Sequence, residues 1–144
     1  MIYNVQGSPL YVYTGGKVFD ATKPTAVFIH GVLNDHSVWI LQTRYFANHG
    51  WNVLAVDLPG HGRSGGKAPA SVQEAAQSIM ALLDAAGVSK AVLIGHSFGS
   101  LIALHATAEH PDRVSQLVMV GTAYPMRVSP ALLDSSLNDP QKAI

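Results

Sequence analysis

The sequence contains no cysteine, which excludes disulfide bonds and thiolate metal sites. Charged residues are scarce at 12% of 144, and nine basic side chains balance nine acidic ones. A net charge of zero with scattered basic residues argues against binding to nucleic acid or anionic membranes. No apolar run approaches the ~20 residues of a membrane span, and the first residues lack the pattern of a signal peptide. We therefore expect a cytoplasmic protein that binds neither membranes nor nucleic acid.

Apolar residues are abundant by contrast, at 48% of the chain, which is enough for a sizeable core. Between Thr25 and Val120, short apolar runs alternate with helix-forming segments, an order typical of a parallel sheet with crossover helices. Weak alternation over residues 1–20 predicts an antiparallel hairpin at a sheet edge. The expected fold class is therefore α/β, a mostly parallel sheet with helices on both faces and an N-terminal antiparallel hairpin.

One predicted helix has clear signals at both ends. Ser71 and Glu74 form the pattern of a capping box, in which each side chain accepts a hydrogen bond from a backbone N–H at the helix start. Gly87 follows the last apolar position and should end the helix near Ala86.

The stretch Gly95-His96-Ser97-Phe98-Gly99 follows a short apolar run and precedes a good helix former. The pattern G-x-S-x-G between a strand and a helix is that of a nucleophile elbow, with Ser97 at the tip of a sharp turn. Gly95 and Gly99 would remove side chains that collide where strand and helix pass close together. The helix start behind Ser97 would also present backbone N–H groups to a developing negative charge.

Two further loops follow predicted strands. His30-Gly31 comes after the run 25–29, and the loop from Asp57 to Gly66 comes after the run 51–56. Because ligands bind at the carboxyl ends of parallel strands, we expect both loops and Ser97 to converge at one edge of the sheet.

These motifs together resemble the α/β-hydrolase superfamily. His30-Gly31 followed by Trp39 is similar to the family's oxyanion loop, and residues 57–64 are similar to its D-x-P-G-x-G-x-S loop. Gly95 to Gly99 is similar to its nucleophile elbow, and residues 110–114 are also typical of it.

The resemblance implies a serine hydrolase that acts on an ester, lactone, amide or activated C–C bond. Ser97 would be the nucleophile, and the backbone N–H groups of Val32 and Phe98 would form the oxyanion hole. His30, Gly31, Gly95 and Gly99 would support the site, and Trp39 would be core or pocket wall. A serine in the elbow disfavours a dehalogenase or epoxide hydrolase, which place aspartate there.

The residues after Ser97 offer no obvious base. The family takes it from a histidine held by an acid, in the chain order Ser, acid, His. Only His105 and His110 follow Ser97, and both are better explained as histidines on the face and at the end of one helix. His36 is a weak candidate that should instead begin a helix. No carboxylate stands at residues 122–124, where some relatives carry the acid.

The expected organisation is therefore a partial hydrolase core over residues 1–122, with residues 123–144 as the start of a cap or a tail. The base and acid would come from a second segment, so the expected partners are a small-molecule substrate and either a C-terminal half or another copy of the chain. No cofactor is implied, and we expect no metal site because the histidines lack close pairing with carboxylates at ligand spacing. Two alternatives stay open: a non-catalytic small-ligand-binding protein on the same fold, and an inactive half-domain that self-associates through residues 117–120.

Overall fold

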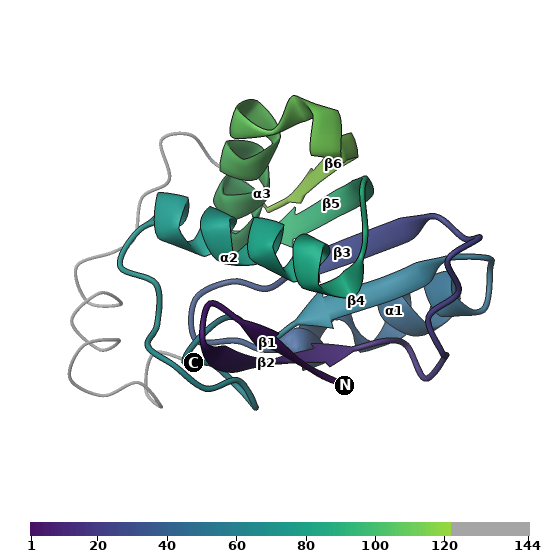
Figure 1. Ribbon diagram of the computed structural model, residues 1–144, viewed down its shortest axis with the longest axis horizontal. Coiled ribbons are helices and arrows are strands. Elements are labelled where there is room, and N and C mark those ends of the chain that lie inside the picture. Colours follow the sequence, from purple (N-terminus) through teal and green to yellow (C-terminus); the bar gives the residue numbers. More distant parts are fainter. Residues whose placement is uncertain (122–144) are drawn as a thin grey trace.

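The computed structural model describes residues 1–121, which form one mixed sheet flanked by helices (Figure 1). The strands are β1 (Ile2–Val5), β2 (Ser8–Tyr13), β3 (Thr25–Ile29), β4 (Asn52–Val56), β5 (Ala91–His96) and β6 (Val114–Val120). The helices are α1 (Ile40–Ala47), α2 (Val72–Ala86) and α3 (Phe98–Glu109), with short 3-10 turns η1 (His36–Trp39) and η2 (Pro111–Arg113). The expected boundary at residue 122 and the cap or tail over 123–144 lie outside the described residues.

The sheet order is β1-β2-β4-β3-β5-β6. Strands β3 to β6 run parallel to one another, whereas β1 and β2 form an antiparallel hairpin in which β2 also pairs antiparallel with β4. Helices α2 and α3 cover one face of the sheet, and α1 lies against the other (Figure 1). The α/β fold class predicted from the sequence is confirmed.

The central strands are buried because both of their sides are covered. Every residue of β3 and β4 is buried, which explains why these strands read as continuous apolar runs without alternation. Side chains on one side pack with α2 and α3 around Leu54, Leu93 and Ile102, and those on the other side pack around Phe28, Trp39 and Ile94.

Both ends of α2 follow from the sequence, with one difference in detail. Ser71 accepts a hydrogen bond from the Glu74 N–H at 3.1 Å, and Gly87 ends the helix in the left-handed region at φ 71°. The Glu74 carboxylate accepts from the Ala70 N–H at 3.4 Å, not from Ser71 as the capping box predicts. Because the chain bends at Ala70, the Ala70 N–H and not the Ser71 N–H lies within reach of the Glu74 carboxylate.

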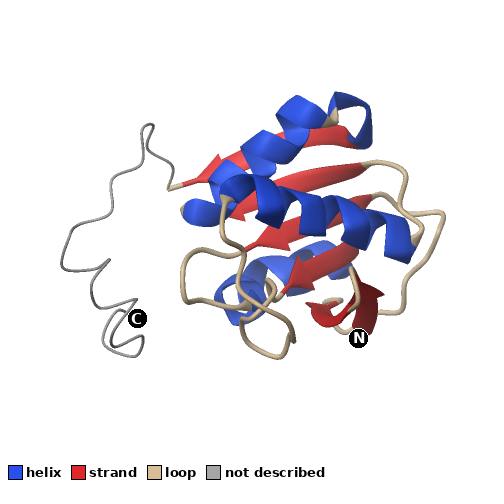
Figure 2. Ribbon diagram, turned by 60° about the vertical axis from the view of Figure 1, so that its left-hand side comes forward, coloured by secondary structure: helices blue, strands red, loops and turns tan. Residues whose placement is uncertain are grey.

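All parallel strands point to the same end of the sheet, and the loops that follow them gather there (Figure 2). This common end is where the sequence-predicted site residues should meet. Among the described residues, no helix is long and apolar enough to cross a membrane.

Candidate active site

Ser97 occupies a sharp turn between β5 and α3. Its backbone has φ 54° and ψ −119°, in the left-handed half of conformational space that residues with a Cβ adopt only at a cost of about 1–3 kcal/mol. Hydrogen bonds hold this turn on both sides: the Ser97 N–H donates to the Val120 carbonyl at 3.0 Å, and the Ser100 N–H donates to the Ser97 carbonyl at 2.9 Å. The surrounding backbone therefore imposes the conformation of Ser97.

Gly95 and Gly99 allow three backbone segments to touch at this turn. A Cβ on Gly95 would lie 2.6 Å from the Ser100 Cα, and a Cβ on Gly99 would lie 2.5 Å from the His30 carbonyl oxygen. Neither position has room for a side chain. The contacts bring β5 close to the start of α3, as the glycine spacing predicts, and they also bring the start of α3 against the end of β3.

The loop after β3 lies directly beside Ser97. A Cβ on Gly31 would stand 3.3 Å from the Ser97 Cβ and 3.4 Å from the His96 carbonyl oxygen. Val32 follows and is 47% exposed, and Phe98 is the first residue of α3. Phe98 therefore carries one of the N–H groups that precede the first bond within the helix. The convergence of the loop after β3 with Ser97 is confirmed.

His30 ties this loop to the one after β4. Its ring is fully buried, and the Leu58 N–H donates to Nε2 at 3.0 Å. Because Nε2 accepts, Nδ1 carries the ring proton and donates to the Gly31 carbonyl at 2.8 Å. Burial lowers the pKa of His30 below its ordinary value, since the charged ring would lose its hydration. His30 is therefore a neutral bridge between two loops.

Asp57 organises the loop after β4 from a fully buried position. Its Oδ2 accepts from the Arg63 N–H at 2.9 Å. Its Oδ1 accepts from the His36 N–H and from His36 Nδ1, each at 2.8 Å. The carboxylate thus links the start of η1, after the Gly31 loop, to the loop that contains Arg63.

The pairing of His36 with Asp57 contradicts the expectation that the histidines lack close carboxylate partners. The two residues are 21 positions apart, so local spacing gave no signal. The available signal was topological, because β3 and β4 are parallel neighbours and the loops after them must lie side by side. His36 does begin a helical turn, as the sequence predicts.

Asp35, His36 and Asp57 each place one oxygen or nitrogen within 4.8 Å of the others, a spacing that could hold a cation. These atoms already have protein partners. Asp35 Oδ1 accepts from both the N–H and the hydroxyl of Ser37, and Asp57 accepts from His36 and Arg63. The arrangement is that of a hydrogen-bonded structural cluster, so we assign no metal to it.

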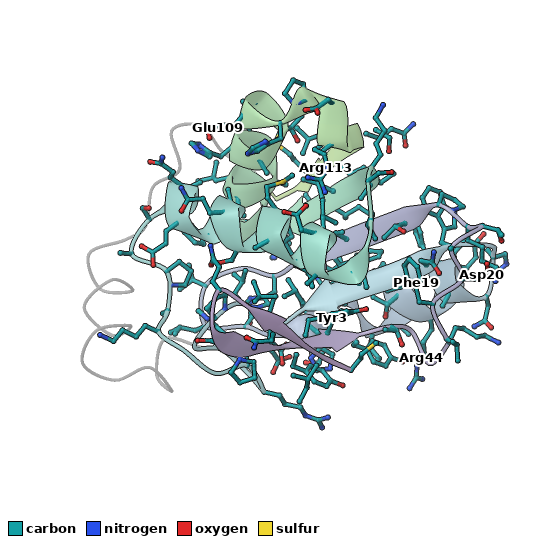
Figure 3. All side chains as sticks on the ribbon, viewed as in Figure 1. Tyr3, Phe19, Asp20, Arg44, Glu109 and Arg113 are labelled. Atoms are coloured by element: carbon teal, nitrogen blue, oxygen red, sulfur yellow. The ribbon has the colours of Figure 1, made fainter. Side chains whose placement is uncertain are left out.

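The two histidines that follow Ser97 in the described chain have other surroundings. His105 lies on α3 with Nε2 3.1 Å from Oε1 of Glu109, the last residue of that helix (Figure 3). His110 is exposed at the C-terminal cap of α3. At a rise of ~1.5 Å per residue, the eight positions from Ser97 to His105 amount to about 12 Å. Both histidines lie on or beyond the helix, as expected.

His96 and Trp39 belong to the opposite side of the sheet from α3. Trp39 is 7% exposed and packs on Phe28 with ring centroids 5.2 Å apart. The His96 ring meets Trp39 edge-on at 6.2 Å. Trp39 is therefore a core residue, which is one of the two roles that the sequence suggests for it.

Comparisons with known proteins agree with the fold. A family model described as the alpha/beta hydrolase fold matches residues 24–142. The lipase LipV of Mycobacterium tuberculosis is 37% identical over 95 residues, covering 66% of this chain and 36% of its own length. An epoxide hydrolase of Caballeronia sordidicola is 36% identical over 93 residues, covering 62% of this chain and 28% of its own length.

A similar solved structure is that of Est816, described as an N-acyl homoserine lactone degrading enzyme. It superposes with a TM-score of 0.78 at 29% identity, covering 99% of this chain and 54% of Est816. The chain thus spans about a third of the curated relatives it matches and about half of this structural relative.

Proposed function

Because the chain belongs to the alpha/beta hydrolase fold family, we propose that it is the nucleophile-bearing part of a serine hydrolase. The substrate class is an ester, lactone, amide or activated C–C bond. The observation that supports this best is the strained turn at Ser97, held at φ 54° beside Gly31, where an added Cβ would stand 3.3 Å from the Ser97 Cβ. A serine kept in this conformation by its surroundings fits a nucleophile aimed away from the sheet.

The proposed chemistry begins with attack of the Ser97 Oγ on the carbonyl carbon. The hydroxyl proton passes to a base, and the carbonyl oxygen becomes an oxyanion that accepts hydrogen bonds from the Val32 and Phe98 N–H groups. Each such donor stabilises the transition state by roughly 2.7–4 kcal/mol. The leaving group then departs with a proton from the same base, and water hydrolyses the acyl-enzyme.

The base and its acid partner are proposed to come from a segment outside the described residues. His105 and His110, the histidines of 98–121, are turned to other partners or lie beyond the helix. The half-buried His36 connects two loops through its contact with the buried Asp57 carboxylate, and we assign it a structural role. Substrate specificity would be set by that further segment as well.

A fluorophosphonate probe, combined with the intact masses of all polypeptides in the sample, tests the proposal. We expect a second polypeptide or a longer chain together with labelling at Ser97, which Ser97→Ala abolishes. Ser115→Ala is the matched control, because Ser115 lies exposed on β6 and should leave labelling unchanged. Ligand binding without labelling would instead favour a non-catalytic binding protein, and a single 144-residue species that is neither labelled nor binds ligand would indicate an inactive half-domain.

A further inference from the structure

The peptide unit that joins Gly31 to Val32 is bonded unequally at its two ends. Its carbonyl, that of Gly31, accepts two hydrogen bonds, from His30 Nδ1 at 2.8 Å and from the Asn34 N–H at 3.3 Å. Its N–H, that of Val32, donates to no acceptor within residues 1–121. The loop therefore fixes the carbonyl end of this peptide and leaves the N–H end unbonded in this part of the chain.

Fixing the carbonyl also fixes the direction of the N–H. A peptide unit is planar and almost always trans, so the Gly31 carbonyl and the Val32 N–H point in opposite directions from one rigid plane. Because His30 holds the carbonyl, the Val32 N–H is directed away from the His30 ring. A Cβ on Gly31 would stand 3.3 Å from the Ser97 Cβ. The N–H group thus has a set direction one residue away from the contact with Ser97.

The His30 ring is held in turn by the loop after β4. The ring is fully buried, and its Nε2 accepts from the Leu58 N–H at 3.0 Å. A backbone N–H only donates, so the ring proton must be on Nδ1, the atom that faces the Gly31 carbonyl. Leu58 is 1% exposed and follows Asp57, whose N–H donates to the Tyr11 carbonyl at 3.0 Å. The bond to Gly31 is therefore anchored, through the ring, to the sheet.

The turn after Gly31 needs such an anchor. The Asn34 N–H closes a turn over residues 31–34, and Leu33, its third residue, has φ 57°. A left-handed conformation is unfavourable for leucine and persists only where the surroundings impose it. The bond from His30 to the carbonyl is shorter than the bond from Asn34 and is the stronger restraint. Without His30, a strained turn alone would hold the peptide.

We propose that His30 is a positioning residue for the hydrolase reaction, which acts through the Gly31 carbonyl to aim the Val32 N–H at the oxyanion. This inference rests on the proposed function, in which that N–H is one of the two oxyanion donors. The Leu58 N–H, the His30 ring and the Gly31–Val32 peptide form one chain of hydrogen bonds, and in such a chain each bond polarises the next. His30 therefore also strengthens the donor before any oxyanion has formed.

Two substitutions separate the two bonds of the ring. In His30→Asn, the side-chain nitrogen reaches the position of Nδ1 and donates to Gly31, but nothing replaces Nε2. In His30→Gln, the side-chain oxygen reaches the position of Nε2 and accepts from Leu58, but the donor to Gly31 is lost. Each variant loses one buried hydrogen bond, so urea unfolding should show similar losses of stability. A His30 that is merely structural predicts equal effects of the two variants on catalysis as well.

The rate of fluorophosphonate labelling at Ser97, in the complete protein with its further segment, tests the positioning role. For His30→Gln we expect the maximal rate to fall about a hundredfold, with the half-saturating probe concentration nearly unchanged, because an oxyanion contact acts mainly in the transition state. His30→Asn should retain most of the wild-type rate. Equal rates in the two variants overturn the proposal, and so does a change confined to the half-saturating concentration.

Nuclear magnetic resonance gives a second readout that does not depend on Ser97 chemistry. The Val32 amide resonance should move in His30→Gln and stay near its wild-type position in His30→Asn. In the wild type, a scalar coupling should join His30 Nδ1 to the Gly31 carbonyl carbon, and its absence overturns the proposal even if neither variant folds. Absence of labelling in the wild type, with the coupling present, overturns the hydrolase function. Labelling of the wild type with an unmoved Val32 resonance in both variants overturns only the positioning role.

Discussion

Ser97 holds a backbone conformation that glycine adopts without strain and other residues do not. The left-handed φ of 54° is fixed by hydrogen bonds to the Val120 carbonyl and from Ser100, which a side-chain change does not remove. We therefore predict that Ser97→Gly raises the free energy of unfolding by about 1 kcal/mol. Urea denaturation measures this. Ser115→Gly, at an exposed position of β6 outside the left-handed region, should lower stability by up to about 1 kcal/mol. A loss of stability in Ser97→Gly would contradict the inference of strain.

The contact between His36 and Asp57 can be tested by changing the donor. His36→Leu removes the Nδ1 group that lies 2.8 Å from a fully buried carboxylate, and should cost about 1.5–3 kcal/mol of folding stability. His36→Asn keeps an N–H donor close to that position and should recover much of the loss. His110→Leu, at an exposed site, is the control and should change stability little. Equal losses in His36→Leu and His36→Asn would show that packing, not the donor, matters.

The buried His30 should make the folding stability depend on pH, with lower stability in acid. Burial lowers its pKa below the ordinary 6.5, so the unfolded chain binds a proton at higher pH than the folded chain does. The stability that neutral His30 contributes is therefore present above pH ~6.5 and is lost as pH falls below it. His30→Gln should be less stable at neutral pH but should lose less on acidification, whereas His110→Gln should follow the wild type. Urea midpoints measured above and below pH ~6.5 test this difference. If the midpoint of His30→Gln falls with pH as steeply as that of the wild type, the explanation is refuted.

The roles of individual residues could be predicted from the sequence where they depend only on adjacent positions in the chain. The turn at Ser97 and the close packing of Gly95 and Gly99 follow from five consecutive residues. The tie between His36 and Asp57 could not be predicted in this way, because it depends on which strands are neighbours. Sequence order separates β3 from β4 by a helix, and only the sheet places the loops after them in contact.

Among the secondary-structure elements, the crossing of β5 and α3 tolerates the least change. A methyl group on Gly95 would lie 2.6 Å from the Ser100 Cα, so backbone must move to admit it. We predict that Gly95→Ala costs about 3 kcal/mol of stability. Gly87→Ala is the instructive comparison, because Gly87 has φ 71° but open space around it. It should cost only about 1–2 kcal/mol, from the left-handed conformation alone. Thermal or urea unfolding separates the two, and equal costs would contradict the steric explanation.

Helices and strands were predictable where one physical signal dominated. Helix α2 has an apolar face, a serine cap and a terminal glycine, and its bounds agree with the structure. The capping box was predicted less well, because Glu74 contacts Ala70 instead of Ser71. That choice depends on the direction of the loop before the helix, which propensity does not describe.

For the whole molecule, the sheet order predicts a gradient of local stability. Strands β3 and β4 lie in the middle and are wholly buried, whereas β6 lies at an edge and is largely exposed. Amide hydrogen exchange should therefore be slowest in β3 and β4 and much faster in β6. Exchange of β6 that is as slow as that of β3 and β4 would contradict this order.

The His30 ring offers a spectroscopic reporter for the site. Its Nδ1 proton is buried and hydrogen-bonded to Gly31, while Nε2 accepts from Leu58. A proton so placed exchanges slowly with water and should give a resolved downfield resonance in the proton NMR spectrum. Its linewidth would report the motion of both loops, because the ring becomes mobile when the hydrogen bond to either Gly31 or Leu58 breaks. The loops beside Ser97 could thus be observed without substrate, inhibitor or any chemical label.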